Sequence, residues 1–201
     1  MCDLPAPTRP GVASLVTSVA GAVLAGGASS RMGRPKAFIE VGGQTLLDRA
    51  VAALSDARAN PIVVVGGDRR AVEAAGHRFV PDEHPGEGPL GGIISALGAA
   101  DTELVVVLAC DLLEASPLAV TRLIAALGTA DVAVPVVDGH AQWLHAVWRR
   151  SAERTLRTAF DRGERAPRRA LNGLVDVEVF GGSPSWYADA DTPTDLPPGV
   201  L

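Results

Sequence analysis

The stretch VLAGGASSRMGRPKAF, residues 23–38, carries the residue types that most directly suggest chemistry. It begins apolar, continues with glycine and serine, and ends with the cations Arg31, Arg34 and Lys36. Glycines let backbone N–H groups approach a phosphate closely, while arginine donates paired hydrogen bonds to it and lysine supplies a point charge. The stretch therefore predicts a site for a small phosphorylated molecule. The alternative is an ordinary strand-to-helix turn with a solvated basic rim.

Two familiar phosphate-binding patterns do not fit this stretch. In a Walker A loop four residues separate the two glycines, and Lys followed by Ser or Thr comes next. Here five residues separate Gly27 from Gly33, and Arg34 follows. The G-x-G-x-x-G dinucleotide fingerprint does not occur within residues 23–38 either.

The composition limits the partners. The net charge of −5 argues against general binding to nucleic acid or to an acidic membrane surface, so the basic residues near position 31 suit a small anion better. Hydrophobic residues make up 47% of the chain but aromatic residues only 4%, which predicts a core of Val, Leu, Ile and Ala.

The two cysteines, Cys2 and Cys110, provide no metal-ligand spacing and no disulfide framework, which favours the reducing cytoplasm. Residues 9–30 resemble a signal peptide in part, but Ser and Thr interrupt the apolar stretch. No stretch reads as a membrane span. The first 18 residues, rich in Pro, Ala and Thr, are expected to form a flexible leader.

Short apolar runs alternate with segments of helical periodicity along the chain. The expected strands are 19–25, 61–67, 78–82, 103–111, two within 132–148, and 175–180. The expected helices are 45–54, 88–100, 116–127 with Ser116 as N-cap, and the charged segment 150–174. Continuous apolar strands alternating with helices predict an α/β fold: a three-layer, Rossmann-like domain with a mostly parallel mixed sheet. No linker is evident, so residues 19–201 are expected to form a single domain.

Ligands in such sheets bind beyond the carboxyl ends of the strands. This rule selects four loops, which follow Leu24, follow Val65, run over 81–92, and start at Asp111. Asp111 comes directly after the most apolar strand, where it could also be a turn residue or a helix cap.

The glycine-rich stretch closely resembles the signature L-A-G-G-x-[ST]-x-R-M-G-x-x-K of MobA-like nucleotidyltransferases, the molybdenum-cofactor guanylyltransferases and their relatives. Four later segments resemble further motifs of the family, in the same order. These are PDEHPGEGPLGGIISAL, ACDLLEASP, QWLHAVWRRS and DADTPTDL. Together they extend from about residue 19 to residue 196. The resemblance implies a fold of the nucleotide-diphospho-sugar-transferase type.

The resemblance also implies an activity. The family transfers a nucleoside monophosphate from a triphosphate to a phosphate acceptor and releases pyrophosphate. For this chain it implies GTP as donor, molybdopterin or its molybdenum form as acceptor, and Mg²⁺ as cofactor. Molybdenum enzymes or their chaperones would be the recipients of the product.

Site residues follow from the matching positions. Arg31, Lys36 and Asp111 are expected to be catalytic, with Arg31 and Lys36 on the triphosphate and Asp111 on the metal. The expected nucleotide-binding residues are Leu24, Ala25, Gly26, Gly27, Arg31, Lys36, Asp82 and Asp111. Asp189 or Asp191 is the expected second metal ligand; the family usually has Asn at both places, and an acidic surface turn before Pro193 is the alternative.

The chain departs from the family pattern at several places. Trp143 and Leu113 each replace a family proline, and the family's Asn after the second strand is missing. LAGG and QWLH favour GTP, whereas MGRPKA and DADTP also resemble the CTP-using branch. His145 matches a family position, but a lone histidine in a strand is expected to be structural.

Two further alternatives stay open. The chain could be a sister enzyme that uses CTP or another phosphorylated acceptor, or a non-catalytic homologue that binds nucleotide without turnover. The arginines of the charged segment are expected to be a solvated helix face, although they could dock an acceptor or a partner. These are Arg162, Arg165, Arg168 and Arg169.

Overall fold

The computed structural model describes residues 18–27 and 35–200. Arg31 and Arg34 therefore lie outside the described residues, as does the expected leader apart from Ser18. The boundary of the single domain expected from residue 19 stays a prediction.

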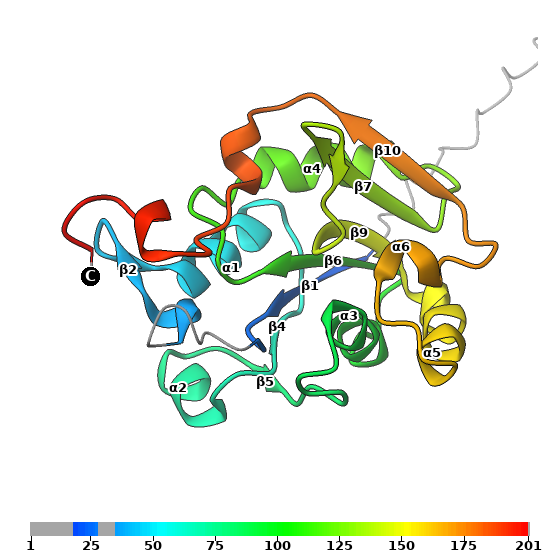
Figure 1. Ribbon diagram of the computed structural model, residues 1–201, viewed down its shortest axis with the longest axis horizontal. Helices are drawn as coiled ribbons and strands as arrows, with labels where there is room; N and C mark the ends of the chain where they lie inside the picture. Colours follow the sequence, from blue (N-terminus) through cyan, green and yellow to red (C-terminus); the bar gives the residue numbers. More distant parts are fainter. Residues whose placement is uncertain (1–17, 28–34, 201) are drawn as a thin grey trace, which may run out of the picture.

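One large sheet runs through the molecule in the order β10-β7-β9-β6-β1-β4-β5, and β8 adds to β7 (Figure 1). Its strands are β1 Val19–Leu24, β4 Ile62–Val65, β5 Phe79–Val80, β6 Leu104–Ala109, β7 Val132–Val137, β8 His140–Ala141, β9 His145–Arg149 and β10 Asp176–Phe180. The pairs β6-β1, β1-β4, β4-β5 and β10-β7 are parallel, whereas β9 is antiparallel to both neighbours. The predicted mostly parallel mixed sheet is confirmed.

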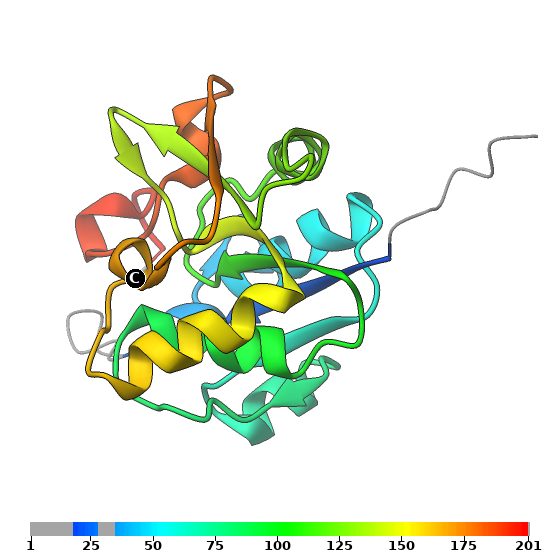
Figure 2. The same ribbon diagram turned by 90° about the vertical axis from the view of Figure 1, so that its right-hand side faces the viewer.

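Helices cover both faces of the sheet. The α-helices are α1 Leu46–Asp56, α2 Arg69–Ala74, α3 Pro89–Gly98, α4 Pro117–Ala126, α5 Glu153–Asp161 and α6 Pro167–Ala170. Residues of α3, α5 and α6 pack into one core, and residues of α1, α2 and α4 pack into the other. Figure 2 shows α3 and α5 on one side of the sheet and α1 and α4 on the other. The predicted three-layer architecture is confirmed.

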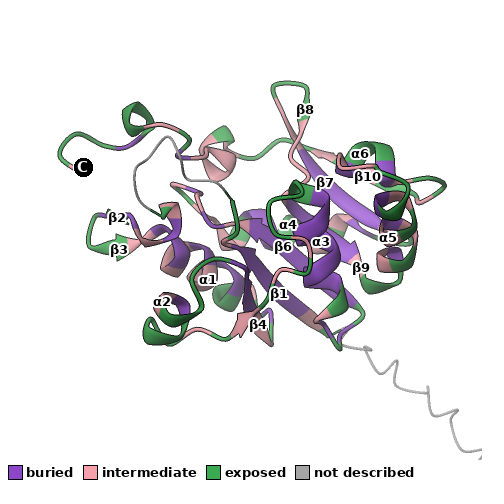
Figure 3. Cartoon of the chain, turned by 60° about the horizontal axis from the view of Figure 1, so that its bottom comes forward, coloured by how far each residue is buried: buried purple, intermediate pink, exposed green. Residues whose placement is uncertain are grey.

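Strand β6 explains why the sequence shows no polar residue there. Val105 and Val107 pack against the helices of one face, whereas Leu104, Val106 and Leu108 pack against those of the other. Because side chains alternate along a strand, a strand covered on both faces must be apolar throughout. The central strands are accordingly buried in Figure 3.

Helix boundaries follow local signals in part. The Thr45 hydroxyl accepts a hydrogen bond from the Asp48 N–H at 3.0 Å and so caps α1. Ser116 occupies the N-cap position of α4, but its side chain makes no capping hydrogen bond. The segment expected to be helical over 150–174 is divided between the 3₁₀ helix η2 (Arg150–Ala152), α5 and α6.

A small hairpin carries one wall of the site. The 3₁₀ helix η1 (Lys36–Phe38) leads into β2 (Glu40–Val41), which pairs with β3 (Gln44–Thr45). Neither this hairpin nor α2 is predicted from the sequence, because strands of two residues and a helix of six are too short to show a clear periodicity.

The C-terminal segment closes over this hairpin. It contains the 3₁₀ helices η3 (Pro184–Tyr187) and η4 (Pro193–Asp195). Five buried residues from the two segments and the start of α1 form a separate apolar cluster: Ile39, Val41, Leu46, Ala190 and Leu196. The cluster fixes the segment around residue 190 at the carboxyl edge of the sheet. In residues 18–27 and 35–200, no helix is long and apolar enough to cross a membrane.

Candidate functional site

A lysine and two aspartates from three distant parts of the chain meet at the carboxyl edge of the sheet. Lys36 Nζ lies 3.0 Å from Asp111 Oδ2 and 2.7 Å from Asp191 Oδ1. The side chains of Lys36 and Asp111 are each only 17% exposed, whereas that of Asp191 is 64% exposed. Burial opposes the charge on Lys36, but its hydrogen bonds to Asp191 and Asp111 outweigh burial and raise its pKa.

Backbone pairing brings the two aspartates together. Asp111 follows the end of β6, and its carbonyl accepts a hydrogen bond from the Ala190 N–H at 2.9 Å. The Leu113 N–H in turn donates to the Ala188 carbonyl at 3.0 Å. The C-terminal segment thus runs antiparallel to the loop after β6, with Leu112 opposite Asp189.

Asp189 lies deeper than Asp191. Burial, together with the charges of Asp111 and Asp191, raises the pKa of Asp189 to about 7. Its Oδ1 is buried and has no hydrogen-bond partner in the part of the chain that the structure describes. That oxygen lies 3.5 Å from Nε2 of His145, whose pKa burial lowers to about 4. His145 is therefore neutral at physiological pH.

The donor set suits a hard cation. Asp111, Asp189 and Asp191 offer carboxylate oxygens, which Mg²⁺ prefers, and the buried Oδ1 of Asp189 still lacks a partner there. Within the described ranges, no group of three or more His, Cys, Asp or Glu residues has an arrangement that could hold a metal ion by itself. Mg²⁺ keeps several waters and needs only one or two protein carboxylates, so the residues present fit it.

Bare backbone lies beside this cluster. The Ala25 N–H donates to the Val65 carbonyl at 2.9 Å, and the Cys110 N–H donates to the Leu24 carbonyl at 3.1 Å. The loops after β1, β4 and β6 therefore meet at one edge. Gly66 has φ +74, and a Cβ there would lie 3.2 Å from Gly26 N and Cα. A side chain at Gly66 would push the neighbouring loop away by a few tenths of an ångström, and the positive φ also favours glycine there.

Asp82 borders the same edge. Its Oδ1 accepts hydrogen bonds from the Ser95 hydroxyl and the His84 N–H, both at 3.0 Å. A Cβ at Gly26 would lie 3.5 Å from its Oδ2. Asp82 thus stands next to the glycine-rich backbone, as a nucleotide-binding residue would.

Most of the predicted site residues come together. Seven of them lie at the carboxyl edge of the sheet, at a strand end or in the segments beyond: Leu24, Ala25, Gly26, Gly27, Lys36, Asp82 and Asp111. Asp189 and Asp191 join them from the C-terminal segment. Arg31 lies outside the described residues. The sequence left Asp189 and Asp191 as equal candidates, and the structure places Asp191 on Lys36 and Asp189 beside His145.

The arginine cluster of 162–169 is partly neutralised. Arg165 pairs with Glu87 at 2.7 Å and Arg169 with Glu164 at 2.8 Å. Two of its four cations therefore already have carboxylate partners, which favours a structural face over an anion-docking site.

Two contributors were not predicted from the sequence: Ser95, which donates to Asp82, and Gly66, which lies against the neighbouring loop. A double glycine directly after the strand ending at Val65 was the available signal for Gly66. The role of Ser95 depends on a tertiary contact and left no signal. His145, which was expected to be structural, faces Asp189.

Comparisons with known proteins identify the family of the chain. Residues 21–177 match the family model for the MobA-like NTP transferase domain. Over 195 residues the chain is 37% identical to a protein from Chloroflexus aggregans named "Probable molybdenum cofactor guanylyltransferase", covering 89% of this chain and 91% of that protein.

Solved structures share the fold. Molybdopterin-guanine dinucleotide biosynthesis protein A from Archaeoglobus fulgidus matches with a TM-score of 0.73 and 25% identity, covering 88% of this chain and 94% of that one. The 2-C-methyl-D-erythritol 4-phosphate cytidylyltransferase from Thermus thermophilus has a TM-score of 0.66 and 22% identity, covering 87% and 94%, and shows the fold alone. The match over residues 21–177 and the 37% identity over most of both chains show that this chain belongs to the MobA-like NTP transferase family.

Proposed function

We propose that the protein transfers GMP from GTP to the terminal phosphate of molybdopterin, or of its molybdenum form, and releases pyrophosphate. The observation that carries the proposal is the meeting of Lys36, Asp111 and Asp191 beside the bare backbone of the glycine loops. The guanylyltransferase names of the similar proteins support the choice of GTP and of this acceptor.

The reaction exchanges one phosphorus–oxygen bond for another. An oxygen of the acceptor phosphate attacks the α-phosphorus of GTP, and the bond to the bridging oxygen breaks as its electrons leave with pyrophosphate. Both reactants are anions, so the protein must align them and offset negative charge.

The residues of the chain divide this work. The backbone of Leu24 to Gly27 faces the nucleotide, and Asp82 helps to orient it. Lys36 supplies a positive charge to the phosphates, and Arg31 is proposed to donate paired hydrogen bonds to them. Before nucleotide binds, the Lys36 ammonium offsets the mutual repulsion of Asp111 and Asp191.

Asp111, with Asp189 or Asp191, would hold Mg²⁺. When bound, the ion would supply electrostatic stabilisation of the charge that develops on the phosphates. Asp111 is less exposed than Asp191, and the hydrogen bond between its carbonyl and the Ala190 N–H fixes its position. Both features favour Asp111 as the principal ligand.

The product would serve molybdenum enzymes, directly or through their chaperones. A cytoplasmic location fits the two cysteines, which are far apart in the sequence and provide no disulfide framework. It also fits the proposed use of GTP, which the cytoplasm supplies.

The deciding experiment measures pyrophosphate release with molybdopterin and Mg²⁺, comparing GTP, CTP and ATP, with an EDTA-treated control. Release with GTP alone that EDTA abolishes is the expected result. Release with CTP instead would identify a cytidylyltransferase. Nucleotide binding without release under any condition would contradict catalysis with this acceptor.

A further inference from the structure

The loop of residues 81–88 carries Asp82 and is held mainly through its side chains. Within the loop, the Glu87 N–H donates a backbone hydrogen bond to the His84 carbonyl at 3.1 Å. The Glu83 N–H donates to the hydroxyl of Ser95 on α3 at 2.9 Å. Gly86 and Gly88 both have positive φ, at +78° and +96°, which gives the loop a turn that only glycine adopts readily.

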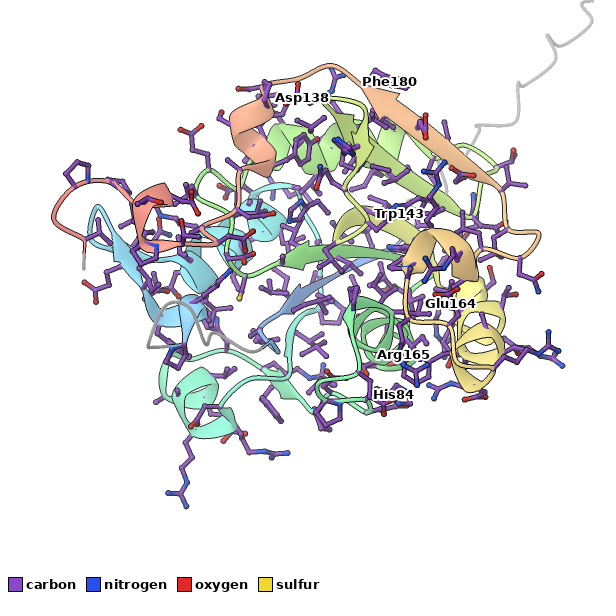
Figure 4. The ribbon with its side chains drawn as sticks, viewed as in Figure 1. His84, Asp138, Trp143, Glu164, Arg165 and Phe180 are labelled. Atoms are coloured by element: carbon purple, nitrogen blue, oxygen red, sulfur yellow. The ribbon has the colours of Figure 1, made fainter. Side chains whose placement is uncertain are left out.

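Three contacts tie this loop to α5 and the residues just beyond it. Glu83 pairs with Arg157 at 2.9 Å, and Glu87 pairs with Arg165 at 2.7 Å. Between them, the His84 ring lies 4.2 Å from the Phe160 ring, measured between centroids. The labelled His84, Glu164 and Arg165 can be followed in Figure 4, close to α3 and α5.

Arg165 differs from an ordinary surface arginine because its guanidinium is fixed on several sides. Its Nη1 donates to the carbonyls of Phe160 and Glu164, both at 2.9 Å. Its guanidinium carbon lies 3.8 Å from the centroid of the Phe160 ring. The Nη2 atom is therefore held in place to bind Glu87, so little side-chain entropy is lost on forming the pair.

From this geometry we infer that Arg165 is a positioning residue for nucleotide binding: it clamps the 81–88 loop through Glu87 and so holds Asp82 against the glycine loop. The inference rests on the proposed function, because it assigns Asp82 to the nucleotide. Ser95 fixes Asp82 from α3, and Arg165 fixes the far end of the same loop from the residues just beyond α5.

These contacts connect Arg165 to the candidate site through the 81–88 loop. They do not require an anion to bind to the arginines of residues 162–169. Glu87 lies between Asp82 and the helix that begins at Pro89, and a Cβ at Gly88 would lie 3.6 Å from Arg165 Cβ. Loss of the ion pair between Arg165 and Glu87 frees the loop at the end away from Asp82. The entropic cost of ordering the loop then opposes GTP binding and lowers the affinity.

The test compares Arg165→Ala and Glu87→Gln with Arg169→Ala, which also removes an ion pair of the same segment but has no contact with the loop. Hydrogen exchange of residues 82–88 reports loop order, and calorimetric titration with GTP in the absence of acceptor reports affinity. We expect both loop variants to exchange faster and to bind GTP about five-fold more weakly, in keeping with one partly exposed ion pair. In turnover, KM for GTP should rise while kcat stays near that of the wild type.

The pairing itself is tested by the double variant. Because both substitutions remove the same contact, Arg165→Ala with Glu87→Gln should bind GTP no more weakly than Arg165→Ala alone. Glu87→Gln removes the ion pair without disturbing α5, so it decides the question even if Arg165→Ala fails to fold.

Unchanged exchange of residues 82–88 in Glu87→Gln overturns the inference, as does a loosened loop with unchanged GTP affinity. A wild-type protein that binds no nucleoside triphosphate contradicts the proposed function instead. In that case the exchange comparison still decides whether Arg165 clamps the loop.

Discussion

Replacing Asp111 by Asn should be far more damaging than replacing Asp191 by Asn, although both carboxylates touch the same ammonium. At 3.0 Å and an effective dielectric of about 20, the attraction between Asp111 and Lys36 is about 5 kcal/mol before desolvation costs. Asp191 lies at 2.7 Å but its side chain is 64% exposed, so in a water-like dielectric its attraction falls to about 1.5 kcal/mol. Asn keeps the shape and one oxygen in both cases, so the comparison isolates charge.

If about half of the larger value is expressed in the transition state, where the Asp111 charge would act on Mg²⁺ and the phosphates, Asp111→Asn should cost about 2–3 kcal/mol of transition-state stabilisation, which lowers kcat/KM roughly 30- to 150-fold. Asp191→Asn should cost less than about ten-fold. The assay is pyrophosphate release with GTP, molybdopterin and Mg²⁺, with the folding of each variant checked by thermal unfolding. An Asp111→Asn enzyme with more than a third of wild-type kcat/KM would refute the reasoning, as would equal losses in the two variants.

Three further outcomes are expected. Gly66→Ala should weaken GTP binding, whereas Gly76→Ala should not. Alanine at either position would be strained by about 1–2 kcal/mol, because both have positive φ. Of the two, a Cβ at Gly66 would meet another loop, whereas one at Gly76 would meet no atom within 4 Å. Calorimetric titration compares their GTP affinities, and equal losses would contradict the close-approach argument. Burial, with the charge of Asp111, raises the pKa of Cys110 to about 12. In a Cys2→Ser variant, iodoacetamide at pH 8 should therefore label Cys110 only after unfolding. Rapid labelling of the folded protein would contradict the raised pKa. Burial alone would raise the pKa of Asp48, but hydrogen bonds from Thr45 and His77 lower it, so its stabilisation exists above the unfolded pKa and is lost as pH falls through the folded pKa. Asp48→Asn should therefore be less stable than the wild type at pH 7, and urea unfolding should show the difference shrinking below about pH 4.

The layered fold could be predicted from the sequence because its signals are local. The apolar run of β6 and the capped start of α1 each appear in a few consecutive residues. The hairpin β2–β3 could not be predicted in this way, since it is held by contacts of Ile39 and Val41 with the distant Leu196 and Ala190.

That several candidate site residues meet at one edge was predictable to a similar degree. Lys36 and Asp111 each lie in a motif beside a strand end, so their types and positions pointed to the edge where they meet. The different surroundings of Asp189 and Asp191 were beyond the sequence, because they depend on tertiary contacts: Asp189 lies beside the buried His145, whereas the more exposed Asp191 reaches Lys36. The partnership of Ser95 with Asp82 likewise depends on how α3 packs.

The pairing of the C-terminal segment with the loop after β6 also sets an order of events during synthesis. Strands β1 to β9 are all synthesised before residue 150, so the central sheet can begin to form before the segment that carries Asp189 and Asp191 has left the ribosome. Lys36 and Asp111 are then in place before Asp191 can reach them. A nascent chain can thus have a folded sheet and still lack its complete set of carboxylates, so the candidate site is completed later than the sheet.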